Sequence, residues 1–257
     1  MTATDRFRVD GKVAIVTGGG GGIGRVYGRA LAEAGASVVL ADLDGNAATD
    51  EAAKLATEGL PVIGVPVDIT DPQSASAMVA AATERFGGVD LLVNNAALMS
   101  EIPRTALTEV PIEWFERVMR VNVMGAVVCA KAVKASMIER GWGRIINQAS
   151  AGAFTAGGVY GVSKLALVSV TADLARELGP RGINVNAIAP GLVETDAGFR
   201  SLGREDPMRQ AIAAGIPGKR AGPPLDLVGA LLLLASPAGD WINGQTLSVD
   251  GGWVMRL

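Results

Sequence analysis

The chain of 257 residues contains no histidine and only one cysteine, Cys129. These absences exclude Ser-His-Asp and Cys-His nucleophile arrangements in their usual form, and also an intrachain disulfide. They leave too few ligands for a zinc site, so no metal is expected. Because no side chain has an ordinary pKa between 5 and 8, proton chemistry at neutral pH must use a perturbed Tyr, Lys, Cys or carboxylate.

Basic charge and long apolar runs are also scarce. The net charge of −3 offers no footprint for nucleic acid. The longest apolar run, 227–235, is interrupted only by Gly229 and is shorter than the roughly 20 residues that span a bilayer. Residues 1–10 carry charges and lack the apolar core of a signal peptide. The sequence therefore predicts a cytoplasmic protein that binds neither nucleic acid nor membrane.

Apolar runs of strand length alternate with segments of helical period. The expected strands are 12–17, 37–42, 61–66, 89–94, 144–148, 183–189 and 245–249. The expected helices are 23–34, 45–58, 72–86, 111–138, 157–178 and 225–235. Near-continuous apolar strands separated by helices predict an α/β fold, with a mostly seven-stranded parallel sheet covered on both faces. The even composition predicts one domain over residues 1–257.

The segment 190–224 stands apart because it is rich in Gly and Pro and only weakly periodic. It follows the carboxyl end of an expected strand, the edge at which parallel sheets bind ligands. We expect a substrate loop that acts as a lid. A plain surface excursion is the alternative.

A glycine-rich string over residues 17–24, TGGGGGIG, joins the first expected strand to the first helix. Glycine permits a tight turn and close backbone approach, and a helix N-terminus offers free N–H groups to a pyrophosphate. Such strings also serve as flexible turns. The strand before it and the helix after it favour a dinucleotide site that includes Gly18, Gly22, Ile23 and Gly24.

Asp42 ends the second expected strand and is followed by Leu43, also a candidate cofactor contact, rather than by a basic residue. A carboxylate there can accept hydrogen bonds from the adenosine ribose and would repel a 2′-phosphate. We therefore expect NAD(H) rather than NADP(H), although Asp42 could simply cap a helix. After the third strand, Asp68 could bond the adenine amino group and Ile69 could pack on its ring. A turn-forming role for Asp68 is equally open.

Tyr160 and Lys164 lie four residues apart, so one helix face brings them together. A charge about 4 Å from the phenol would contribute about 4 kcal/mol at an effective dielectric near 20. The lysine is thus expected to lower the tyrosine pKa toward the range useful for acid–base catalysis. The pentapeptide alone also fits an ordinary surface Lys beside a half-buried Tyr.

Taken together, these motifs resemble the classical short-chain dehydrogenase/reductase family from about residue 10 to the C-terminus. The Thr-Gly-x-x-x-Gly-Ile-Gly element matches residues 17–24, and Asn-Asn-Ala-Gly appears as residues 94–97 with Ala97 in place of the last Gly. Further matches are Asn122, Ser150, Tyr-x-x-x-Lys at Tyr160 and Lys164, and Pro-Gly at 190–191 followed by Val193 and Thr195. The resemblance implies a Rossmann-type doubly wound sandwich.

The resemblance also implies roles for these residues. Tyr160 would be the general acid/base, and Ser150 would polarise the substrate oxygen. Lys164 would bind the nicotinamide ribose, and Asn122 would support a water that relays protons to it. The resemblance further assigns cofactor contacts to Asn95, Val193 and Thr195. Only ten residues separate Ser150 from Tyr160, fewer than in most of the family, so substrate analogies are the weaker part of the resemblance.

The leading interpretation is an NAD(H)-dependent oxidoreductase that interconverts a secondary alcohol and a ketone. A pocket is expected over residues 99–105, 151–159 and 197–216, with a hydrophobic or alicyclic substrate and an apolar lining from Ala153, Phe154, Phe199, Leu202, Met208 and Ile212. A β-ketoacyl thioester reductase is the nearer alternative, and a non-catalytic dinucleotide-binding regulatory protein is the alternative of another class. The resemblance implies a homo-oligomer, a tetramer or a dimer, assembled through the helices that follow strands four and five.

Overall fold

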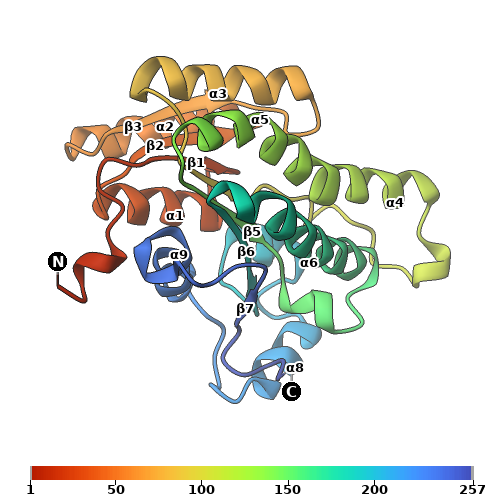
Figure 1. Cartoon of the computed structure of the whole chain (residues 1–257). Coiled ribbons are helices and arrows are strands. Elements are labelled where there is room, and N and C mark those ends of the chain that lie inside the picture. Colours follow the sequence, from red (N-terminus) through yellow and green to blue (C-terminus); the bar gives the residue numbers. More distant parts are fainter. Residues whose placement is uncertain (1, 256–257) are drawn as a thin grey trace.

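The computed structural model describes residues 2–255, and its centre is a sheet of seven parallel strands (Figure 1). The strand order is β3-β2-β1-β4-β5-β6-β7. The strands are β1 (Val13–Thr17), β2 (Ser37–Asp42), β3 (Val62–Pro66), β4 (Leu91–Asn94), β5 (Gly143–Gln148), β6 (Ile183–Pro190) and β7 (Thr246–Val249). The predicted α/β class and seven-stranded parallel sheet are confirmed.

Helices cover both faces of this sheet, because its buried strands present apolar side chains alternately to each side. On β1, Ala14 and Val16 join the core on one face, whereas Ile15 joins the core on the other. The first face packs against α1 (Gly22–Glu33), α2 (Gly45–Thr57) and α9 (Val228–Ala235). The second packs against α3 (Pro72–Phe86), α5 (Gly125–Glu139) and α6 (Gly158–Leu178).

The long helix predicted over 111–138 is interrupted. The structure has α4 (Ile112–Met119), a π-helical segment η3 (Arg120–Met124) and then α5. The Gly125 N–H donates to the Arg120 carbonyl, five residues back. A Cβ at Gly125 would lie 2.6 Å from Ile69 Cδ1. The wider turn lies where this helix meets the loop after β3, and single π turns are frequent at functional sites.

The segment 190–224 is more ordered than its composition indicates, since it contains α7 (Asp196–Ser201) and α8 (Pro207–Gly215). Its two ends meet in a parallel bridge between Val193 and Gly222. The Arg104 guanidinium ties the segment to the loop after β4 through a 2.9 Å ion pair with Asp206, which caps α8. We call residues 190–224 the lid below, after the role predicted for this segment, which stays a prediction. Short 3-10 turns occupy Asp5–Phe7, Leu107–Glu109, Ala151–Phe154, Gly179–Arg181, Pro224–Leu227 and Pro237–Gly239.

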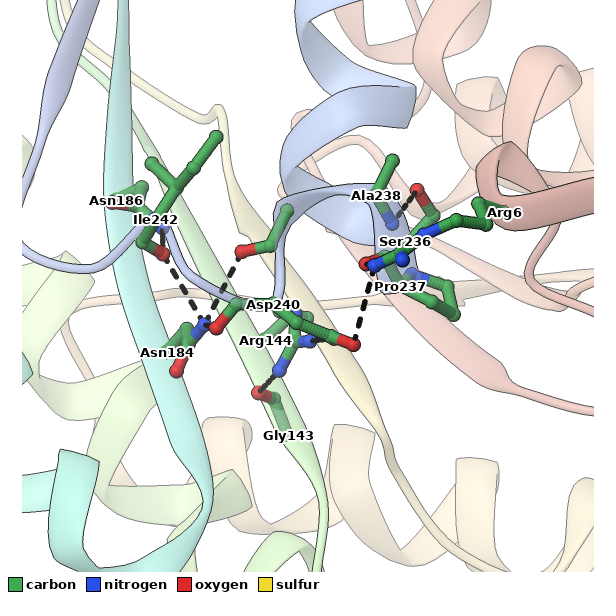
Figure 2. A network of polar contacts seen from close by, with 11 residues as sticks. Arg6, Gly143, Arg144, Asn184, Asn186, Ser236, Pro237, Ala238, Asp240 and Ile242 are labelled. Atoms are coloured by element: carbon green, nitrogen blue, oxygen red, sulfur yellow. Dashed lines mark hydrogen bonds and ion pairs between the residues drawn. The ribbon is translucent and has the colours of Figure 1, made fainter. Parts of the chain in front are cut away.

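Figure 2 shows a polar network at the amino-terminal edge of the sheet. Arg144, at the start of β5, donates to the Asp240 carboxylate, and Asn184, at the start of β6, donates to the Asp240 carbonyl at 2.9 Å. The Arg6 guanidinium donates to the Pro237 carbonyl at 2.6 Å. These bonds join the N-terminal turn, two strands and the segment before β7. They secure the edge opposite to the one that carries the site described below.

Two helical runs, Ile112–Glu139 and Gly158–Arg181, are long and apolar enough by length and composition to cross a membrane. Core helices of soluble proteins pass the same test, so it is weak evidence. Both runs contribute buried residues to the sheet core, including Val133 and Ala175. The predicted lack of a membrane partner stays a prediction.

Candidate active site

A cavity of about 470 Å³ opens at the carboxyl edge of the sheet. It lies where the strand order reverses between β1 and β4, the place at which open α/β sheets bind ligands. Of the catalytic and cofactor-binding candidates from the sequence, those that line it are Gly18, Gly22, Ile23, Asp42, Asn95, Ser150, Tyr160, Lys164, Val193 and Thr195. The fold thus brings together residues from the loops after four strands.

The glycine-rich turn after β1 forms one wall of this cavity. Gly18 has φ +65°, which favours glycine, and a Cβ at Gly24 would lie 2.0 Å from the Gly18 carbonyl oxygen. Gly24 therefore lets α1 start directly against the turn, and it does not line the cavity itself. The residue before α1, Gly21, has no side chain with which to cap the helix. The first-turn N–H groups are left for a ligand, and such groups favour anions.

The Asp42 carboxylate is held at the end of β2 by two backbone donors. One oxygen accepts from the Gly20 N–H at 3.0 Å, and the other accepts from the Asp44 N–H at 3.1 Å. Asp44, rather than Asp42, caps α2. The helix-cap alternative for Asp42 is therefore wrong. Its half-buried carboxylate lines the cavity with a fixed orientation and retains acceptor capacity.

Asn95 lines the cavity, but its side-chain amide nitrogen is hydrogen-bonded within the protein. Its side-chain nitrogen donates to the carbonyls of Thr17 and Gly18, at 2.9 and 3.2 Å. The Thr17 hydroxyl accepts in return from the Asn95 and Ala96 N–H groups, each at 3.1 Å. Asn95 therefore clamps the turn after β1 to the turn after β4. Its predicted contact with a cofactor remains a prediction.

Tyr160 and Lys164 lie on α6, and Ser150 lies in the turn between β5 and that helix. The Lys164 ammonium is 5.6 Å from the centroid of the Tyr160 ring and donates to the Gln148 carbonyl at 2.7 Å. Lys164 is 2% exposed. The Ser150 hydroxyl accepts from the Gly152 N–H at 3.0 Å. All three side chains line the same cavity, as a proton-transfer group and its supports must.

The pKa values of the pair differ from the sequence expectation. Burial raises the pKa of Tyr160 to about 12, although its hydrogen bond with Ser150 opposes the rise. Burial also lowers the pKa of Lys164 to about 7. The expectation assumed a fully charged lysine beside a solvated phenol. Desolvation disfavours both charges, so in this structure it outweighs the attraction between them.

Asn122 is 2% exposed and lies in the π-helical segment rather than in the cavity wall. Its side-chain oxygen accepts from the Leu98 N–H at 2.7 Å, and its nitrogen donates to the Leu98 carbonyl and the Ser163 hydroxyl, each at 3.0 Å. Both amide hydrogens are therefore used within the protein. Asn122 joins the loop after β4 to α6 one residue before Lys164, and its support of a water remains a prediction.

Three further candidates lie outside the cavity wall. Leu43 is 77% exposed, and Ile69 is 8% exposed against Gly125. The Asp68 carboxylate accepts from the Thr70 N–H and hydroxyl, both at 2.8 Å, and these bonds hold the pKa of Asp68 below its ordinary value. The structure thus shows Asp68 forming a local turn. Its predicted bond to adenine remains a prediction, as does the packing of Ile69 on the ring.

The expected apolar lining of the substrate end is only partly right. Leu202 lines the cavity, together with Met99 and Ala197, but the other five expected residues do not. Phe154 packs on the small cluster around Ala149 instead, and Met208 is 59% exposed. Sequence reasoning missed Gln148, which lines the cavity two residues before Ser150. Arg200 also lines it, within the predicted range 197–216, although it was not singled out.

Comparison with known proteins agrees with this geometry. A family model described as enoyl-(acyl carrier protein) reductase matches residues 18–254. An uncharacterised oxidoreductase of Mycobacterium tuberculosis is 44% identical over 247 residues, which cover 96% of this chain and 99% of the relative. The chain belongs to the classical short-chain dehydrogenase/reductase family. Its Rossmann-type fold and its place among the oxidoreductases of that family follow.

Two solved structures of this family resemble the chain over its full length. One is a gluconate 5-dehydrogenase from Burkholderia cenocepacia in complex with NADP and tartrate, 35% identical with a TM-score of 0.92. The other is a 7α-hydroxysteroid dehydrogenase complexed with NADH and 7-oxo glycochenodeoxycholic acid, also 35% identical with a TM-score of 0.92. Each likeness covers 100% of both chains. Because these relatives hold different nicotinamide cofactors, similarity alone leaves the choice of NAD or NADP open.

Proposed function

We propose that this protein is an NAD(H)-dependent oxidoreductase that interconverts a secondary alcohol and a ketone, on a largely hydrophobic or alicyclic substrate. The observation that carries the proposal is the convergence of Ser150, Tyr160, Lys164 and Asp42 on one cavity. The first three are the groups that alcohol–ketone chemistry requires, and the fourth is a cofactor anchor. The chain would act as one catalytic domain with residues 190–224 as its lid.

The cavity suits a nicotinamide dinucleotide. The uncapped first turn of α1 and the glycine turn before it would hold the pyrophosphate, and the doubly anchored Asp42 carboxylate would accept from the adenosine ribose hydroxyls. A 2′-phosphate would meet that carboxylate at the end of β2, which disfavours NADP. Val193 and Thr195, across the cavity, would hold the nicotinamide end.

The bound nicotinamide would supply or accept the hydride, and the protein supplies the proton and the orientation. In the reducing direction Tyr160 donates its phenolic proton to the carbonyl oxygen while the Ser150 hydroxyl holds that oxygen. In the oxidising direction Tyr160 must be a phenolate that takes the proton of the alcohol. Because burial keeps the pKa of Tyr160 near 12, the structure suits the acid role at neutral pH, and oxidation should speed up as pH rises.

We further propose a homo-oligomer, a dimer or a tetramer, assembled through α5 and α6. Four large apolar side chains are exposed on these helices or just before α5: Met124, Val127, Val162 and Leu165. Such side chains are ordinarily covered when they form a patch. A monomer in light scattering at micromolar concentration would exclude this assembly. A cytoplasmic location is part of the same proposal.

The proposed function is tested by screening secondary alcohols and ketones, with acetoacetyl-coenzyme A included, against NAD(H) and NADP(H). Turnover is followed by the absorbance of the reduced nicotinamide. Turnover of alcohols or simple ketones with NAD(H) supports the proposal. Preferential turnover of the thioester indicates a β-ketoacyl reductase instead. NADH binding without any turnover indicates a regulatory protein.

A further inference from the structure

Arg200 is a solvent-exposed residue whose positive charge lies in the wall of the active-site cavity. It lies on α7 of the lid, and the next two residues, Ser201 and Leu202, line the same cavity. Apart from Arg200, the charged side chains that line the cavity are Lys164, already bonded to Gln148, and the carboxylates of Asp42 and Asp196. The positively charged side chain of the cavity wall that is not already bonded to the protein is therefore Arg200, in the lid.

Within residues 2–255, no hydrogen bond or ion pair engages the Arg200 guanidinium. By contrast, two other cations of the lid are bonded, since Arg220 binds Asp226 at 2.5 Å and the Lys219 ammonium donates to the Ala214 carbonyl at 3.3 Å. Asp196 lies one helical turn before Arg200 but forms no ion pair with it at 4.0 Å or less. Arg200 thus retains all five of its N–H donors for a ligand.

A second arginine of the lid packs against α7, the helix that carries Arg200, although it does not line the cavity itself. Arg209, on α8, is only 5% exposed, and both terminal nitrogens lack an acceptor among the described residues. It stacks on the ring of Phe199, the residue before Arg200, at 4.5 Å, and Arg204 stacks on that ring at 3.8 Å. A buried guanidinium cannot lose its proton, so an unpaired one is costly unless an anion comes near. Arg204 and Arg209 therefore share the ring next to Arg200, and within residues 2–255 no ion pair joins any of the three to a carboxylate.

The position of Arg200 separates it from the pyrophosphate end of the cavity. Thr195, at the start of α7, lies against the glycine turn, since its side chain is 3.9 Å from the place of a Cβ on Gly22. Arg200 comes five residues later, about 7 Å further along the helix at about 1.5 Å per residue. The first turn of α1 already provides the anion site for a pyrophosphate. The lid arginine is therefore available to a different anion.

We propose that the substrate carries a carboxylate at some distance from its reacting carbon, and that Arg200 binds this carboxylate when the lid covers the cavity. The substrate class is then an amphipathic oxo or hydroxy acid, with an apolar body against Met99, Ala197 and Leu202 and its anionic end at α7. Arg209 contributes indirectly, through the stacking that holds Phe199 beside Arg200. This inference rests on the proposed function for the location of the reacting end.

The test compares acids with their uncharged esters in the NAD⁺-loaded protein, in which a ketone binds but cannot react. The probes are 4-oxopentanoate, 4-oxocyclohexanecarboxylate and 4-oxo-4-phenylbutanoate, each paired with its methyl ester and measured by titration calorimetry. An arginine–carboxylate hydrogen bond contributes about 1.5–3 kcal/mol, which corresponds to about 10- to 100-fold in affinity. We expect at least one acid to bind about tenfold or more tightly than its ester.

Arg200→Gln should bring the acid and ester affinities together, and Arg200→Lys should restore part of the preference. Arg181→Gln, which removes the same charge from an exposed turn outside the cavity, serves as the control and should keep the full preference. Equal binding of acids and esters by the unaltered protein overturns the inference. So does an Arg200→Gln variant that retains the preference, or one whose loss is matched by an equal loss of NADH affinity. If the acids are preferred but no ketone is ever reduced, the proposed function fails while the carboxylate site stands.

Discussion

The buried ammonium of Lys164 predicts an unusual dependence of stability on pH. Its pKa falls from an ordinary 10.5 to about 7 because folding removes the side chain from water. At about 1.36 kcal/mol per pH unit, this change corresponds to about 5 kcal/mol of folding free energy lost while the unfolded lysine is charged. Removing the charge should therefore stabilise the cofactor-free protein.

The direction in which stability changes with pH follows from proton binding to Lys164 in the folded and unfolded states. Between pH 7 and pH 10.5 the unfolded chain holds a proton on Lys164 that the folded protein has released, so the free energy of unfolding rises with pH. Below pH 7 both states hold the proton and the dependence levels off. From pH 7 to pH 8.5 the expected rise is about 1.5 kcal/mol. No histidine titrates in this interval.

The titration of Cys129 sets the upper limit of the pH range in which the effect of Lys164 on stability can be measured. Burial raises the pKa of its thiol to about 12, so above the ordinary thiol pKa only the unfolded chain loses that proton. This contribution lowers stability as pH rises and opposes the effect of Lys164. Measurements that stop at pH 8.5 keep the two contributions apart.

The assay is urea unfolding at pH 7 and pH 8.5, at one protein concentration and without cofactor. Lys164→Met keeps the apolar stem and should remove the rise, with a higher stability than the unaltered protein at pH 7. Lys54→Met removes an exposed lysine of α2 as a control and should preserve the rise. A flat stability in the unaltered protein, or a rise that survives Lys164→Met, would refute the reasoning.

Three other substitutions test the site. Tyr160→Phe should abolish nearly all turnover while NADH still binds in fluorescence titration, and substantial residual activity would remove the tyrosine from proton transfer. Asp42→Ala should lower the preference for NAD over NADP in kcat/KM by about 10- to 100-fold, because bonds to a carboxylate contribute about 1.5–3 kcal/mol. An unchanged ratio would make Asp42 structural. Gly24→Ala should cost about 2 kcal/mol or more and lower Tm by several degrees, since its Cβ would lie 2.0 Å from backbone. Gly229→Ala, where nothing lies within 4 Å, is its control and should be neutral or stabilising.

Local sequence patterns were enough for the scaffold of this protein. The seven strands lie within two residues of their predicted limits at each end, because the signal of a β-branched apolar run depends on only a few neighbouring residues. The glycine turn, Asp42, Ser150, Tyr160 and Lys164 were all predictable as members of one site. In parallel sheets the carboxyl ends of the strands meet at one edge, so their order along the chain already places them together.

Properties that depend on contacts between segments far apart in the sequence could not be predicted from local sequence patterns. The π turn at Asn122 reflects bonds to Leu98 and Ser163, which come from other parts of the chain. The pKa values of Tyr160 and Lys164 moved against the sequence expectation, because desolvation depends on every element packed around them. Within the predicted range 197–216, the facts that Arg200 lines the cavity and that Arg209 is buried likewise depend on how this segment folds. Sequence determined which groups could react, whereas packing decided which of them are charged and which are free to bind.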